Sequence, residues 1–168
     1  MERPEPPLAG GEKETLTAFL DYHRATLLMK LDGVSDEDLR RPMVPSGTTL
    51  LGMVKHLAYV ERSWFQRVFS NIDVEFPWTD EDPDADFRIE PAETTSEVVE
   101  LYKGEFQKSR DTTEAASLDD LARFKYPKDP RPGNFSLRWI LVHMIEETAR
   151  HNGHADILRE LIDGTTGE

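Results

Sequence analysis

The segment EETARHNGHAD, residues 146–156, concentrates side chains that can bind protons or metal ions. Glutamate, arginine, histidine and aspartate residues all occur there within about three helical turns. Such a group either forms a satisfied polar network or holds a ligand. Glu147 and His151 are four residues apart, so they meet on one face of a helix. The same spacing lets one helix offer two ligands to a metal ion.

On a helical wheel His151 falls inside the apolar sector of its helix, and a buried imidazole needs a partner for each nitrogen. A Glu–His pair at this spacing is also common as a plain hydrogen bond. A metal site therefore needs a further ligand from another helix. His56, in GMVKHLAYVERSWF (52–65), is the candidate. It lies off the centre of its helix's apolar sector, on a face that could border a pocket.

Other ionisable residues near these two helices have alternative explanations. Glu61 projects into an apolar sector and would be costly if unpaired, so a buried bridge to an arginine of another helix is one explanation. Arg150 is placed to form an exposed salt bridge with Glu146. His154 and His143 lie near the edge of the apolar sector. Together with Arg150 and Glu61, they are candidates for orienting the ligands or binding substrate.

The overall composition excludes several classes of function. The formal net charge of −13 disfavours binding to nucleic acids and anionic membranes. No apolar stretch approaches the ~20 residues of a membrane span, and the N-terminus lacks the features of a signal peptide, so we expect a cytoplasmic protein. The absence of cysteine excludes cysteine nucleophiles and cysteine-based zinc sites. Any thiol chemistry would need a thiol that arrives with a substrate.

The apolar periodicity predicts an all-α protein, a four-helix bundle with long connecting loops. Long helices are expected over 12–32, from 48 or 49 to 70, from a capping box at 94–97, and from an N-cap at Ser136 to Gly164. Between these helices we expect one short helical turn within 35–47 and a short helix at 117–124. Loops are expected at 73–91 and 126–134, and the acidic loop at 73–91 is expected to be exposed to solvent. Residues 1–168 are expected to form one domain, with 1–11 loosely ordered.

Two motifs together resemble a known family. TTLLGMVKHLAYVERSWF, followed about ninety residues later by LVHMIEETARHNGHAD, is similar to the DinB/YfiT-like metalloenzymes. The branch that it resembles most is similar to mycothiol-dependent maleylpyruvate isomerase. The resemblance implies one divalent metal ion held by His56, Glu147 and His151. Many relatives have histidine where this chain has Glu147, a difference that changes the charge of the site but keeps the spacing.

Two histidines and a carboxylate leave a coordination position open, as in catalytic zinc sites. Zinc is the expected ion, although nickel, iron or manganese would accept the same donors. The resemblance implies a small-molecule substrate and a thiol-dependent, mycothiol-type transferase or isomerase; activated water would make a hydrolase instead. A non-catalytic, stress-associated metal-binding bundle is the alternative. Relatives of this kind also suggest a homodimer.

Overall fold

The computed structural model describes residues 3–124 and 135–167, in which helices are joined by turns and irregular segments. Its elements are α1 (Glu12–Met29), α2 (Asp36–Leu39), α3 (Leu50–Glu61), η1 (Arg62–Phe69), η2 (Ala85–Phe87), α4 (Thr95–Ala115) and α5 (Leu137–Asp163). The all-α prediction is confirmed: the described residues contain no strand, only an isolated bridge between Leu121 and Ser136. None of their helices is long and apolar enough to cross a membrane.

Most helix ends are where the sequence predicted them, because their capping residues are present. Thr49 and Ser136 accept hydrogen bonds from the first turns of α3 and α5. Thr94 and Glu97 form the predicted capping box of α4. Gly164 ends α5 with a positive φ of 79°, a conformation that favours glycine.

Two expectations about the connecting segments have different outcomes. The short helical turn within 35–47 is α2. The short helix expected at 117–124 is wrong: the chain there forms turns whose backbone bonds to other segments, with Ala122 N donating to Phe135 O and Leu137 N donating to Asp120 O. The expected loop at 126–134 lies outside the described residues.

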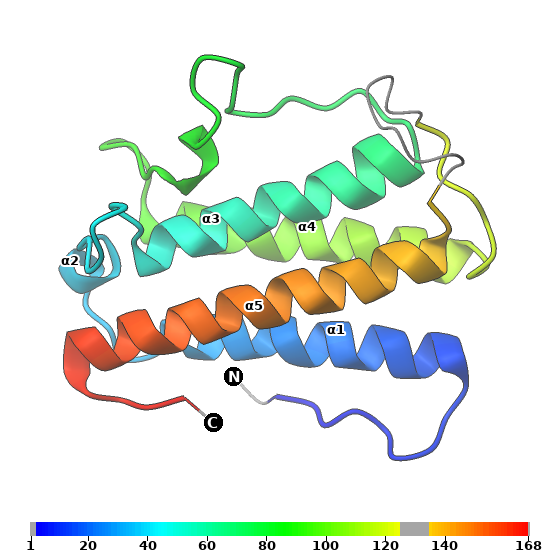
Figure 1. The fold of residues 1–168 in the computed structure, drawn as a ribbon, viewed down its shortest axis with the longest axis horizontal. Helices are drawn as coiled ribbons and strands as arrows, with labels where there is room; N and C mark the ends of the chain where they lie inside the picture. The colour runs from blue at the N-terminus through cyan, green and yellow to red at the C-terminus, as the bar shows by residue number, and fades with distance from the viewer. Residues whose placement is uncertain (1–2, 125–134, 168) are drawn as a thin grey trace.

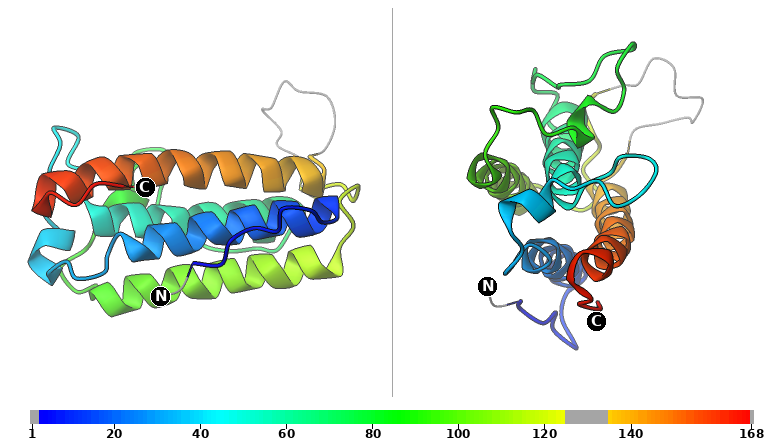
Figure 2. Two further views of the ribbon diagram at one scale, coloured as in Figure 1. Left: turned by 90° about the horizontal axis from the view of Figure 1, so that it is seen from below. Right: turned by 90° about the vertical axis from the view of Figure 1, so that its left-hand side faces the viewer.

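The four long helices form a bundle with one long crossover (Figure 1). α1 and α5 run in one direction and lie side by side, whereas α3 and α4 run together in the opposite direction. Two consecutive helices that run the same way need a connection that returns along the bundle. Residues 71–94, which include the acidic segment, form that connection and pass along the outside of α3 (Figures 1 and 2).

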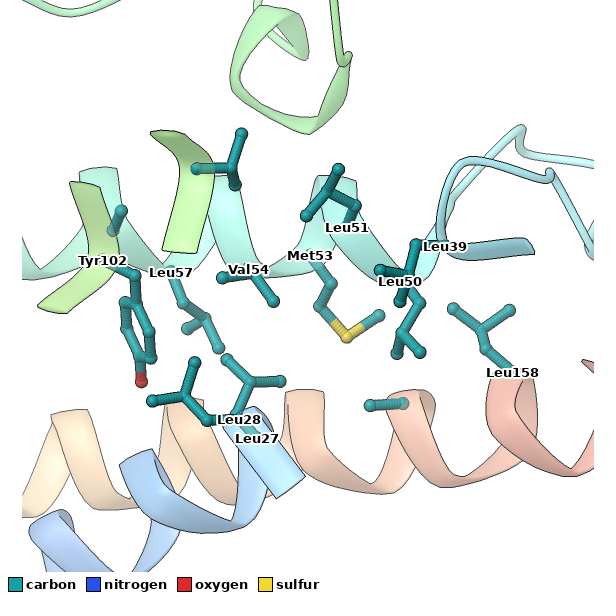
Figure 3. Packing of buried hydrophobic residues seen from close by; sticks show 13 residues of the cluster. Leu27, Leu28, Leu39, Leu50, Leu51, Met53, Val54, Leu57, Tyr102 and Leu158 are labelled. Carbon is teal, nitrogen blue, oxygen red and sulfur yellow. The ribbon is translucent and has the colours of Figure 1, made fainter. Parts of the chain in front are cut away.

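The interior formed by the described residues contains two apolar clusters and a buried ion pair. Figure 3 shows Leu27 of α1 and Leu158 of α5 extending towards α3, which contributes Met53 to the same cluster. The guanidinium of Arg24 on α1 donates to both carboxylate oxygens of Glu61 at 2.7 Å each. Both side chains are almost completely buried. This is the bridge to an arginine of another helix that the sequence analysis raised for Glu61.

The helix that begins as α3 continues as a π-helix, η1. A wider turn of this kind shifts the side chains that follow it around the helix axis. Arg62 and Gln66 of η1 both donate to Glu105 of α4, with Arg62 Nη2 lying 2.8 Å from Oε1. Glu105 is therefore a buried carboxylate that joins the π-helical segment to its neighbouring helix.

Candidate metal centre

His56 of α3 and the Glu147–His151 pair of α5 meet in the groove between these helices. His151 Nε2 lies 3.3 Å from Glu147 Oε1, and His56 Nε2 lies 3.9 Å from the same oxygen. One donor atom from each residue lies within 4.8 Å of the other two. All three side chains are partly buried, at 12–20% exposure. Residues that are 91 positions apart in the chain (147 − 56) thus form one cluster.

The segment that crosses α3 completes the surroundings of His56. Oδ2 of Asp86, in η2, lies 2.8 Å from His56 Nδ1. Phe87 stacks on the imidazole with ring centroids 3.9 Å apart and planes 15° apart. The expectation that residues 73–91 form a solvated loop is therefore wrong for Asp86, which is buried. Its carboxylate can be buried there because His56 provides a hydrogen-bond donor.

Contacts with α3 hold this segment in place. Gly52 leaves room for the carbonyl oxygen of Phe87, which would lie only 2.1 Å from a Cβ at position 52. The buried ammonium of Lys55 donates to the carbonyl oxygen of Arg88 and to the Glu93 carboxylate, at 2.8 Å each. One backbone contact and one lysine thus attach the Asp86–Phe87 turn to the helix that carries His56.

The cluster is electrostatically arranged for a cation. The neighbouring imidazoles of His151 and His56 hold the pKa of Glu147 well below its usual range, so this residue is a carboxylate. Burial alone would lower the pKa of His56, but its hydrogen bond with Asp86 and the nearby Glu147 carboxylate outweigh burial and raise the pKa. Two carboxylates thus favour positive charge near His56.

The donors fit a divalent metal ion. A carboxylate can only accept a hydrogen bond, so the proton between Asp86 and His56 is on Nδ1, and Nε2, which lies on the side of Glu147, is the nitrogen that could bind a cation. Ligands in a tetrahedral zinc site lie about 3.4 Å apart, given bonds of about 2.0–2.1 Å. The separations of 3.3 Å and 3.9 Å lie close to that value. The three residues could therefore hold a cation with small movements of their side chains.

The other sequence-predicted residues lie around this cluster rather than in it. His154 is exposed beside His151, with ring centroids 5.5 Å apart. Arg150 forms the predicted exposed ion pair with Glu146. His143 lies one turn before Glu147 on α5 and stacks on Trp139, with ring centroids 5.1 Å apart. Glu61 uses both carboxylate oxygens to bind Arg24, as described above.

Asp86 and Phe87 are the residues at this site that the sequence analysis missed. One signal could have indicated Asp86: an imidazole that binds a metal through one nitrogen usually donates its other N–H to a carboxylate or carbonyl. The acidic segment contains several carboxylates, but no periodic pattern distinguishes the buried one. Phe87 has no comparable signal because loop residues lack a regular facing pattern.

Comparison with known proteins shows the fold and the family of the chain. A search of curated proteins found no match. A crystal structure described as the conserved protein of a locus from Enterococcus faecalis is similar, with a TM-score of 0.66 and 14% identity over 94% of this chain and 100% of that one. At that identity the similarity shows the fold alone. The family described as Mycothiol-S-transferase matches residues 15–164, nearly the whole chain. The chain therefore belongs to the mycothiol-S-transferase family.

Proposed function

We propose that this protein is a metal-dependent transferase that joins a low-molecular-weight thiol of the mycothiol type to an electrophilic small molecule. The observation that carries the proposal is the convergence of His56, Glu147 and His151 in a chain of this family. In the reaction a sulfur–carbon bond forms and the thiol loses its proton. In a substitution the leaving group departs with its bonding electron pair; in an addition the π electrons of a conjugated acceptor move away from the attacked carbon and take up a proton.

The protein residues have defined tasks in this proposal. His56, Glu147 and His151 would hold the cation, which lowers the pKa of a thiol that reaches it and stabilises the thiolate. Asp86 keeps the proton of His56 on Nδ1, so that Nε2 faces the cation. Phe87 covers one face of the His56 ring and reduces its contact with water.

The composition supports an external thiol as nucleophile. The chain contains no cysteine, so it cannot supply a sulfur nucleophile of its own. The cluster provides three protein donors, which leaves a coordination position open in a four-coordinate ion. Zinc is the proposed ion because it binds nitrogen and oxygen donors in this number without a redox change.

The proposal can be tested with cobalt-substituted protein and purified mycothiol. We expect mycothiol to change the cobalt absorption spectrum. With monochlorobimane as the electrophile, we expect the fluorescent mycothiol adduct to form faster with the protein than without it. The His151→Ala variant should lose both effects, whereas His143→Ala, which changes a histidine one turn away from Glu147, should retain them.

The outcomes separate the proposal from its alternatives. A cobalt-loaded protein that neither responds to mycothiol nor accelerates adduct formation would contradict the transferase. In that case the non-catalytic metal-binding bundle becomes the better explanation. A response to glutathione equal to that for mycothiol would contradict the thiol specificity while leaving the metal site intact.

A further inference from the structure

A second feature of the groove is an apolar cavity of about 350 Å³ beside His151. Met53 and Leu158 form its buried wall, Phe87 and Ile157 line other parts, and His151 and His154 contribute imidazole edges. Ligand pockets typically measure about 300–1,000 Å³, so this cavity suits a small molecule. Because His151 lines the cavity, its occupant would lie next to the cluster.

The cavity differs in charge from its neighbour. Apart from the two histidines, no ionisable side chain lines it among the residues that the structure describes. An adjoining cavity of about 600 Å³ shares Phe87 and Thr48 but is lined by Arg40, Asp84 and Arg88. The smaller cavity would desolvate an ionic ligand and has no carboxylate, lysine or arginine in its lining to pair with it, which is unfavourable. The net charge of −13 further disfavours anions.

We infer that this cavity binds the acceptor substrate, and that the acceptor is a neutral, predominantly apolar molecule. The identification of the ligand as an acceptor rests on the proposed function. The preference for a neutral, apolar ligand follows from the residues that line the cavity alone. The apolar body of the molecule packs against Met53, Ile157 and Leu158, and its reactive carbon points to the His151 edge. Apolar area removed from water provides the affinity.

Two fluorinated probes of similar size test the preference without any thiol. 4-Fluorotoluene is neutral and apolar, whereas 4-fluorobenzenesulfonate carries a charge on a group that coordinates metals poorly. Each is titrated into zinc-loaded and cobalt-loaded protein and followed by ¹⁹F NMR. We expect saturable binding of 4-fluorotoluene, with extra broadening from cobalt, and binding of the sulfonate at least about tenfold weaker.

Matched variants locate the binding site. Ile157 is 56% exposed and lines the cavity, whereas Leu161, one turn later on α5, is 51% exposed and is not among the lining residues. Ile157→Asp should weaken 4-fluorotoluene binding about tenfold, and Leu161→Asp should not change it. If Ile157→Asp has a lower melting temperature than the wild type, Ile157→Ser replaces it as a milder change.

Three results would overturn the inference: equal binding of the two probes, no cobalt broadening in protein that holds cobalt, or equal effects of the variants at positions 157 and 161. None of these measurements depends on turnover. A protein without transferase activity can therefore still show the preference, and an active transferase can fail to show it. The failure of one proposal is thus distinguishable from the failure of the other.

Discussion

The Asp86 carboxylate lies 2.8 Å from Nδ1 of His56, and this contact joins the crossover segment to the α3 residue of the candidate metal-binding cluster. A carboxylate that accepts from one ring nitrogen orients the imidazole and increases the basicity of the other nitrogen. The acidic segment is therefore part of the candidate site through the buried side chain of Asp86 and the neighbouring ring of Phe87.

The first prediction concerns this contact. Asp86→Asn should weaken zinc affinity about 10–100-fold, the usual effect of removing a partner of a metal-binding histidine. Competition with a chromophoric chelator measures the affinity directly. Asp84→Asn is the control, because Asp84 is exposed and only two residues away. Equal affinities of wild type and Asp86→Asn would show that Asp86 has no positioning role.

The second prediction concerns the metal content of the protein. Elemental analysis after gel filtration should find about one divalent ion per chain in the wild type. His56→Ala and His151→Ala should each lose most of it, because two donors bind a cation far less well than three. His143→Ala should keep its ion. Full metal content in His56→Ala would exclude a site shared between α3 and α5.

The third prediction separates Glu61 from the metal site. Glu61→Ala leaves the buried Arg24 with only the partly exposed carboxylate of Asp21 as a partner, and should lower the free energy of unfolding by up to about 3–5 kcal/mol. Urea denaturation measures the loss. Replacing both residues, as Arg24→Met with Glu61→Leu, should restore most of the stability because no unpaired charge remains. A loss of zinc affinity without a loss of stability would instead assign Glu61 to the metal site.

The fourth prediction is a pH dependence of stability caused by Glu105. Burial alone raises the pKa of this carboxyl, but hydrogen bonds from Arg62, Lys108 and Gln66 outweigh burial and lower it. A pKa that is lower in the folded state gives stability that is present above the ordinary value of 4.5 and is lost as the pH falls through the folded pKa.

Urea denaturation of the metal-free protein between pH 7 and pH 3 measures this effect. The stability of Glu105→Gln should fall less over that range than the stability of the wild type. Glu100→Gln on the same helix should follow the wild type, because Glu100 is an exposed residue whose side chain is 67% accessible. Parallel curves for wild type and Glu105→Gln would contradict the assignment.

The fifth prediction concerns Gly52. A Cβ at this position would lie 2.1 Å from the Phe87 carbonyl oxygen, so Gly52→Ala must push the Asp86–Phe87 turn away from α3. We expect zinc affinity to fall as it does for Asp86→Asn. Gly104→Ala on α4 is the control: its new methyl group meets nothing within 4 Å. That change should stabilise the helix by about 0.5–1 kcal/mol.

Much of the fold could be predicted from local patterns. The capping box at Thr94 and Glu97 and the N-cap at Ser136 are short-range hydrogen bonds, so nearby residues suffice to predict them. The pairing of Glu147 with His151 likewise follows from helical spacing. The short helix expected at 117–124 was wrong because backbone bonds to residues distant in sequence decide that segment's conformation.

The rest of the site depends on contacts between distant segments. The helical wheel gave only partial support for His56, and its place beside Glu147 was implied by the family resemblance. Asp86 contacts His56 across thirty residues, from a turn whose position depends on Gly52 and Lys55. Because the acidic segment has no periodic pattern of apolar and polar residues, its sequence does not predict that contact.

The placement of the three donors on α3 and α5 also has a consequence for the lifetime of the protein. An ion held by both helices binds the folded chain but not the unfolded one, so it adds about 2.7 kcal/mol of stability when its free concentration is a hundred times its dissociation constant. Because proteases remove unfolded copies, cellular abundance would follow the metal supply. Metal starvation would then deplete the polypeptide as well as its activity.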